Sequence, residues 1–196
     1  DKFSRITKKM MSLLKKQLTE ESEAKRAKLR DKIAELEEMT DEIEENIASF
    51  LVKISEQSLS ESASIKIRSI LSITSDLERI ADIIYRMSRD IHRGNKHNLK
   101  FSAGQHENIA KMFDLVDASF EIMTNHLSEP YGKVDISDAI AMEDEINKMK
   151  AKLRKKHLKS TEKKEYDVKS GIIYKDLFFA AEKLGDHIIN VSEAIR

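Results

Sequence analysis

Helix breakers are scarce in this sequence, which has one proline and five glycines among its 196 residues. Because both residue types interrupt helices and mark turns, so few of them predict long helices rather than a sheet of many strands. Apolar residues recur at helical spacing, without the alternating runs that are typical of β-strands. We therefore predict an all-α fold with six helices, at residues 3–18, 23–55, 61–92, 102–127, 136–158 and 164–195.

The second and third predicted helices carry the clearest packing surfaces. In each of them apolar residues recur every seven positions, and a second apolar series lies in between, which is typical of helices that pack in a bundle. We expect both main series to be buried: Leu29, Leu36, Ile43 and Phe50 in the second helix, and Ile70, Leu77, Ile84 and Ile91 in the third. Gly94, which follows basic residues, is expected to end the third helix.

The sequence also contains an internal repeat. A shift of 104 positions places Glu78-Arg79-Ile80-Ala81-Asp82 on Glu182-Lys183-Leu184-Gly185-Asp186, and a shift of 103 places Asp41 on Asp144. Heptads alone would align apolar positions at many shifts, but they would not also align a Glu-basic-apolar-small-Asp pattern. We therefore predict two tandem three-helix bundles, residues 1–96 and 97–196, related by a pseudo-twofold axis.

Composition excludes several classes of protein. Lys+Arg and Asp+Glu both number 35, so the chain lacks the basic excess of most nucleic-acid-binding proteins, and we expect no nucleic-acid partner. There is no cysteine, which excludes thiol catalysis, disulfides and thiolate metal sites and is compatible with a reducing cytoplasm. No apolar run approaches the roughly 20 residues that span a bilayer.

Acidic residues line one edge of the third helix and one edge of the second. At about 100° per residue, Glu78 and Asp82 fall on the same flank, one turn apart and beside the buried series. Glu37, Asp41 and Glu44 form a matching edge on the second helix. If the two helices are neighbours, four or five carboxylates gather there, and such a cluster needs a cation or basic partners.

The corresponding edge of the second half is thinner, because Ile140 and Asn147 replace Glu37 and Glu44. Two interpretations of the acidic residues remain open. They are solvated or paired with Lys and Arg, as acidic residues beside a packed stripe usually are, or they are ligands of a metal ion. In the second case the candidate metal ligands are Glu37, Asp41, Glu78, Asp82, Asp144, Glu182 and Asp186.

Motifs of the common enzyme classes are missing. The six histidines, at positions 92, 97, 106, 126, 157 and 187, form none of the Glu-x2-His pairs of di-iron bundles, and His187 is expected in a surface or packing role. The five glycines are isolated, so no phosphate-binding loop is present, and no Ser/His/Asp set is evident. We predict that the chain is not an enzyme and holds no organic cofactor.

The segment Asp76-Leu77-Glu78-Arg79-Ile80-Ala81-Asp82 resembles the signature of the PhoU family, approximately Asp-Leu-Glu-Arg-Ile-Gly-Asp, and residues 180–187 are similar to its second copy. The resemblance implies two three-helix bundles and a role in phosphate uptake or its regulation. It also implies that Glu78 with Asp82, Glu182 with Asp186, and Glu37 with Asp41 are ligands of iron or other metal ions. Ala180, which stands where the first copy has Asp76, departs from the pattern.

Among PhoU-like proteins the chain is expected to be most like the C-terminal domain of bacterial Na/phosphate cotransporters, since it starts at Asp1 within an amphipathic stretch. That setting predicts a non-enzymatic regulatory domain, cytoplasmic and tethered to the inner membrane by a preceding transporter domain. Its partners would be that membrane domain or phosphate-transport and signalling proteins, with a homodimer as a further expectation. The alternatives are a free-standing cytoplasmic PhoU-type regulator, or a metal-binding or structural helical bundle that has no connection with phosphate.

Overall fold

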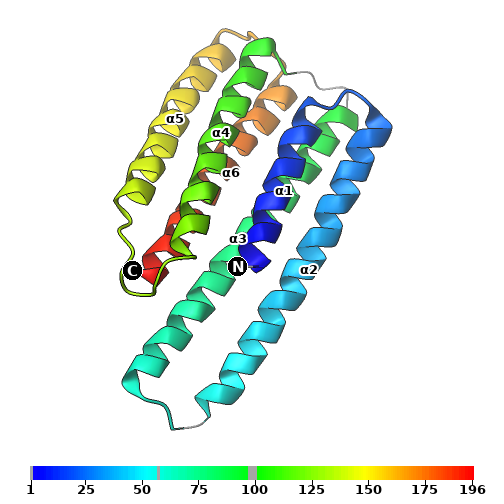
Figure 1. Ribbon diagram of the computed structural model, residues 1–196. Coiled ribbons are helices and arrows are strands. Elements are labelled where there is room, and N and C mark those ends of the chain that lie inside the picture. The colour runs from blue at the N-terminus through cyan, green and yellow to red at the C-terminus, as the bar shows by residue number, and fades with distance from the viewer. Residues whose placement is uncertain (1, 57, 97–100) are drawn as a thin grey trace.

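The computed structural model describes residues 2–56, 58–96 and 101–196, and these residues form helices joined by short loops, without any strand (Figure 1). The predicted all-α class is therefore confirmed. The predicted boundary between the repeats, at residues 96 and 97, and His97 itself fall at or beyond the edge of the described residues. The helices are α1 (Lys2–Thr19), α2 (Glu23–Ser55), α3 (Glu61–Lys96), α4 (Ala103–His126), α5 (Ser137–Glu162) and α6 (Val168–Ile195).

The helices pack as two bundles of three. In the first bundle α1, α2 and α3 contact one another, and in the second α4, α5 and α6 do the same. The bundles are joined by the pairs α3–α6 and α1–α4, and α3 runs antiparallel to α6 (Figure 1). Exchanging α1 with α4, α2 with α5 and α3 with α6 leaves this set of contacts unchanged, as a pseudo-twofold axis requires. The predicted repeat is thus a repeat of structure.

Polar side chains at the helix starts explain several boundaries. Ser102 and Gln105 form a capping box at the start of α4, and Ser22 caps α2. The sixth helix starts later than predicted because Asp167 caps it by accepting from Lys169 N and Ser170 N. The fifth helix extends to Glu162, beyond the predicted end at residue 158.

Gly94 does not end α3, and that prediction was wrong. The residue lies inside the helix, which continues to Lys96, and it is buried against α6. A Cβ atom built on Gly94 would lie 3.2 Å from Ile173 Cδ1, so the missing side chain allows the two helices to approach closely. Gly132, in contrast, has a φ of 76° and lies in the turn between α4 and α5.

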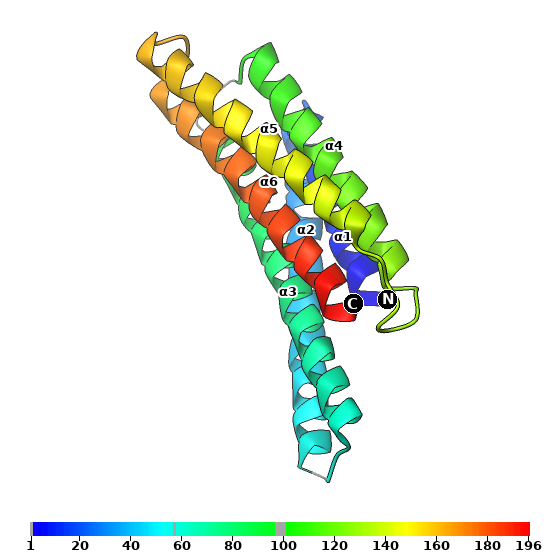
Figure 2. The ribbon, with the colours of Figure 1, turned by 90° about the vertical axis from the view of Figure 1, so that its left-hand side faces the viewer.

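The core runs along the inner faces of both bundles, but the predicted buried series is only partly buried. Leu77, Ile84 and Ile91 are buried, whereas Ile70 is 44% and Phe50 is 62% exposed. The reason is visible in Figures 1 and 2, where the C-terminal part of α2 and the N-terminal part of α3 project as a hairpin beyond the other helices. Two helices alone cannot cover both of their apolar faces.

Within the described ranges, none of the helices has the length and apolar character needed to cross a membrane.

Candidate functional site

The acidic edges of α2 and α3 face one another. Burial raises the pKa of Glu37, and the neighbouring carboxylates of Asp41 and Asp82 raise it further. Burial likewise raises the pKa of Glu78, and Asp82 and Asp41 add to the effect. Because each of these carboxyls feels charges from both helices, the four side chains form one repelling group, which we call the acidic seam (Glu37, Asp41, Glu78 and Asp82).

The acidic seam has little compensation from basic residues. Arg86 Nη2 lies 3.1 Å from Asp82 Oδ2 on the outer side, where both side chains are largely exposed. In the part of the chain that the structure describes, no lysine or arginine pairs with Glu37, Asp41 or Glu78. The donor set, made of carboxylate oxygens alone, fits a hard cation. The side chains as placed do not converge on a common point, since no group of three or more His, Asp or Glu among the described residues has the geometry of a metal site.

In the second half, lysines neutralise the corresponding carboxylates. Glu182 is buried, and Lys150 Nζ from α5 lies 2.5 Å from its Oε1. The same ammonium lies 4.9 Å from the centre of the Phe179 ring, a cation–π contact. Lys183 pairs with Asp186 at 2.5 Å. Each acidic residue that α6 brings to this edge therefore has its own cation.

The two halves differ in charge compensation because equivalent positions of the repeat carry different residues. Lys150 stands where α2 has Ile47, so the first half has no ammonium on that helix to meet Glu78. Asp144, the counterpart of Asp41, is exposed on the surface of α5. One oxygen still lacks a full partner, because Glu182 Oε2 is buried without a hydrogen bond, with Lys183 Nζ at 3.8 Å. This orphaned oxygen is the one feature of the second edge that a cation would satisfy.

A polar contact across the bundle interface was not predicted. His187 Nδ1 lies 2.8 Å from Asp76 Oδ1, and Asn190 Nδ2 donates to the same oxygen over 3.2 Å. These residues join α3 to α6, so His187 holds the two halves together. A signal for this contact was present in the sequence, since the second copy has Ala180 where the first has Asp76.

A Ser/His/Asp arrangement is also present, although none was expected. His126 Nδ1 lies 3.0 Å from Ser192 Oγ, and His126 Nε2 lies 3.1 Å from Asp138 Oδ1. Ser192 is completely buried, so its hydroxyl cannot meet a substrate. The first half has an equivalent buried pair, in which Ser88 Oγ donates to Gln17 Oε1 over 2.7 Å. The repeated serine therefore ties the first helix of each bundle to the third.

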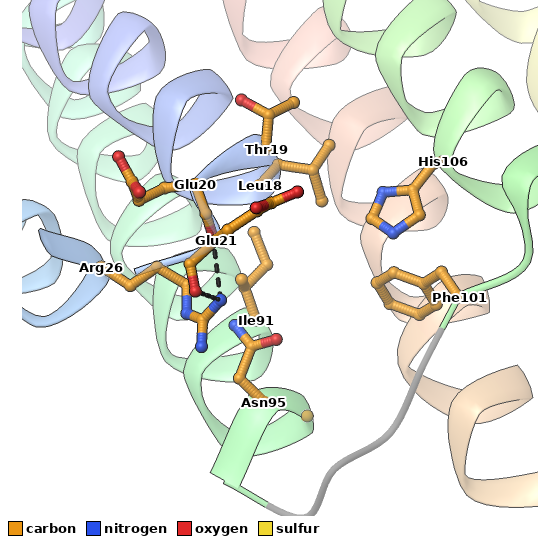
Figure 3. A pocket seen from close by; sticks show the side chains of 10 residues that line it. Leu18, Thr19, Glu20, Glu21, Arg26, Ile91, Asn95, Phe101 and His106 are labelled. Carbon is orange, nitrogen blue, oxygen red and sulfur yellow. Dashed lines mark hydrogen bonds between the residues drawn. The ribbon is translucent and has the colours of Figure 1, made fainter. Parts of the chain in front are cut away.

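A cavity of about 580 Å³ opens where the two bundles meet, beside the C-terminal ends of α1 and α3 (Figure 3). Arg26 lies at one side of it, and Phe101 and His106 lie across the opening. The guanidinium of Arg26 donates to the backbone oxygens of Glu20 and Glu21, over 2.9 and 3.0 Å. Since two of its donors hold the loop between α1 and α2, we assign this arginine a structural role.

Comparison with known proteins agrees with this architecture. The family model described as "PhoU domain" matches residues 1–91. PhoU from Pseudomonas aeruginosa superposes with a TM-score of 0.84 at 15% identity, covering 98% of this chain and 90% of that one. The phosphate transport system regulatory protein PhoU from Streptococcus pneumoniae superposes with a TM-score of 0.73 at 16% identity, covering 98% and 89%. No curated protein sequence gives a significant match.

At such identities the two structural matches establish the fold, and the family model adds the sequence relationship for the first repeat. The resemblance to the PhoU family is confirmed, whereas the cotransporter setting stays a prediction. Residues 1–91 match the PhoU domain model, and the two repeats together have the fold of PhoU proteins.

Proposed function

We propose that this chain is a non-enzymatic regulator of phosphate transport, which acts by docking its helices on phosphate-transport or signalling proteins. The observation that carries the proposal is the match over 98% of the chain to a protein named as a phosphate transport system regulator. The family model over residues 1–91 supports it from the sequence. The projecting part of the α2–α3 hairpin, with exposed Phe50, Val52, Ile65 and Ile70, offers apolar surface for a protein partner.

Two settings fit this role. In one the chain is a free-standing regulator, and in the other it is the regulatory part of a Na/phosphate cotransporter. Coverage of 90% and 89% of two PhoU chains supports the free-standing setting at least as well as the transporter one. The coding sequence upstream of Asp1 distinguishes them, because several hydrophobic spans there would establish the transporter setting.

Phosphate uptake in the host tests the role. Cells that lack the coding segment are expected to lose the normal dependence of radiolabelled phosphate uptake on external phosphate, and expression of the segment in trans or in its native position restores it. Uptake that is identical with and without the segment, at both scarce and abundant phosphate, would contradict the proposal.

We further propose that the acidic seam binds a divalent or iron cation. The crowding that raises the pKa of Glu37 and Glu78 supports this, because a cation between the helices would remove the repulsion and accept the carboxylate oxygens as ligands. In the second half Lys150 and Lys183 already neutralise the corresponding carboxylates. The first half is therefore the better candidate for metal binding, and binding requires rotamer changes that bring the four carboxylates together.

Metal analysis separates this proposal from an ordinary acidic surface. Protein purified without chelator is measured for bound metal, and the chelated protein is titrated with Mn²⁺, Fe²⁺ and Zn²⁺. Glu78→Gln with Asp82→Asn is expected to abolish binding, whereas Glu42→Gln, an exposed carboxylate of α2 outside the seam, leaves it unchanged. Equal binding by wild type and the double variant would refute the metal site and would leave the regulatory role standing.

A further inference from the structure

Arginines gather in a groove between α2 and α3, next to the acidic seam. The groove has a volume of about 660 Å³, and its lining includes Arg30 from α2 and Arg86, Arg89 and Arg93 from α3. His92 and Tyr85 also line the groove. Two aspartates, Asp31 and Asp90, also line it, so four guanidinium groups face two carboxylates in a chain whose formal net charge is zero.

Arg86 and Arg93 are only loosely committed to partners within the protein. Arg93 Nη2 lies 2.9 Å from Asp90, in a pair whose arginine is 58% exposed, and the pair of Arg86 with Asp82 is similarly open. Such exposed pairs contribute little to stability, so their donors can be shared with an incoming anion.

Arg89 has no ion pair among the described residues. Its guanidinium lies 5.7 Å from the centre of the Tyr85 ring, and this contact holds the group in place.

On the α2 side, Arg30 is held in a defined orientation. Its Nε and Nη2 donate to Asp31 Oδ1, over 3.0 and 2.7 Å, and its Nη1 lies 3.0 Å from His92 Nε2. An arginine can only donate, so Nε2 accepts and the His92 proton sits on Nδ1. The imidazole therefore has an N–H donor, and Arg30 bridges the two helices at the groove.

The fold does not require this basic groove. At a shift of 104, the positions of Tyr85, Arg86 and Arg89 are taken in α6 by Ile189, Asn190 and Glu193. The equivalent seam of the second half packs without them. The spacing of residues 86, 89 and 93 places three guanidinium groups on one face of α3. Stability of the hairpin does not explain why they were placed there together.

We propose that this arginine groove binds a phosphoryl group or a comparable multiply charged oxyanion of a small molecule. Guanidinium groups bind phosphate through paired N–H donors, and four of them line this groove from two helices. Arg86 belongs both to the groove and to the edge of the acidic seam, so an anion in the groove competes with Asp82 for it. The proposal does not rest on the regulatory role or on the metal site, since neither requires an anion here.

Calorimetric titration with inorganic pyrophosphate and with inorganic phosphate, at constant ionic strength, tests the site. Saturable binding is expected for wild type. Arg89→Gln alone is expected to weaken it roughly tenfold, and Arg89→Gln with Arg93→Gln at least as much, since charge-assisted hydrogen bonds are lost. The matched control is Arg154→Gln with Lys155→Gln, two exposed basic residues of α5 in the basic run 148–159. This control is expected to bind as wild type does.

Vesicles distinguish the source of the phosphoryl group. Co-sedimentation with vesicles that contain phosphatidic acid, reduced by the Arg89 and Arg93 substitutions, would assign the site to a lipid headgroup. Binding of free pyrophosphate alone would assign it to a soluble ligand. The proposal is overturned if neither probe binds, or if the α5 control loses as much affinity as the groove variants, because attraction would then be general rather than local. All substituted residues are exposed, and unfolding temperatures verify that the variants fold.

Discussion

Replacing Glu78 by glutamine is expected to stabilise the metal-free protein at neutral pH. Glu78 repels Asp82 one turn away on α3 and Asp41 on α2. Like charges at this helical spacing destabilise by about 0.2–0.5 kcal/mol, and a similar figure for the contact across the helices makes a total of about 0.5–1 kcal/mol. Glutamine has nearly the helix propensity of glutamate, so the backbone term cancels. For a chain of this size the gain corresponds to about 1–4 °C in Tm.

The assay is thermal unfolding in chelator-containing buffer of low ionic strength, with Glu42→Gln as the control. The gain is expected to shrink in about 0.5 M salt, because screening weakens interactions between partly exposed charges. It also shrinks on acidification. A group whose pKa is raised in the folded state stabilises the fold at pH values below its pKa in the unfolded state. This stabilisation is lost as the pH rises through its pKa in the folded state. Wild-type and Glu78→Gln proteins should therefore converge below about pH 4.5, the ordinary glutamate value.

A Tm that falls, or that changes no more than in Glu42→Gln, would refute the view of the acidic seam as a repelling cluster. The change in Tm on adding a metal cation is a second test. In the wild type a bound cation replaces repulsion by attraction, so metal should raise its Tm above that of the variant.

Three further substitutions test other contacts by urea unfolding. Gly185→Ala would place a Cβ atom 3.0 Å from Ile146 Cδ1, so overpacking of about 1–3 kcal/mol should exceed the helix-propensity gain of about 1, and Ile146→Val should relieve it. Lys150→Met leaves the buried Glu182 with only the more distant Lys183 and should cost about 1–3 kcal/mol, recovered by adding Glu182→Gln. Asp76→Ala leaves two polar side chains of α6 unpaired and should cost about 1–3 kcal/mol. A variant whose free energy of unfolding equals that of the wild type would contradict the corresponding prediction.

The fold could be predicted because its determinants are local or repeated. Scarce breakers indicate long helices, and the recurring pattern at Glu78 and Glu182 indicates two related halves. Exposure of Phe50 and Ile70 could not be predicted in the same way. Heptads show which face of a helix is apolar, but they do not show which other element covers that face. Gly94 was misread for a similar reason, since its role depends on α6, more than 70 residues away along the sequence.

The carboxylates of the candidate site could be predicted from the sequence, but the lysines that pair with some of them could not. Helical spacing places Glu78 and Asp82 on one flank, and the short connection between α2 and α3 brings Asp41 to the same seam. The contact of Lys150 with Glu182 depends on the register of α5 against α6 and on the reach of a long side chain, and neither is visible in spacing. The arginine groove was missed because part of it comes from α2, although the spacing of Arg86, Arg89 and Arg93 along α3 was visible in the sequence.

Phosphate uptake by cells that carry seam variants in place of the native sequence tests most directly a claim that links the two proposals, namely that this chain regulates phosphate transport and that the regulation needs the acidic seam. Cells with Glu78→Gln and Asp82→Asn should show the same altered dependence on external phosphate as cells without the chain, at equal protein level, while Glu42→Gln cells behave as wild type. Normal uptake in the double variant would contradict the claim.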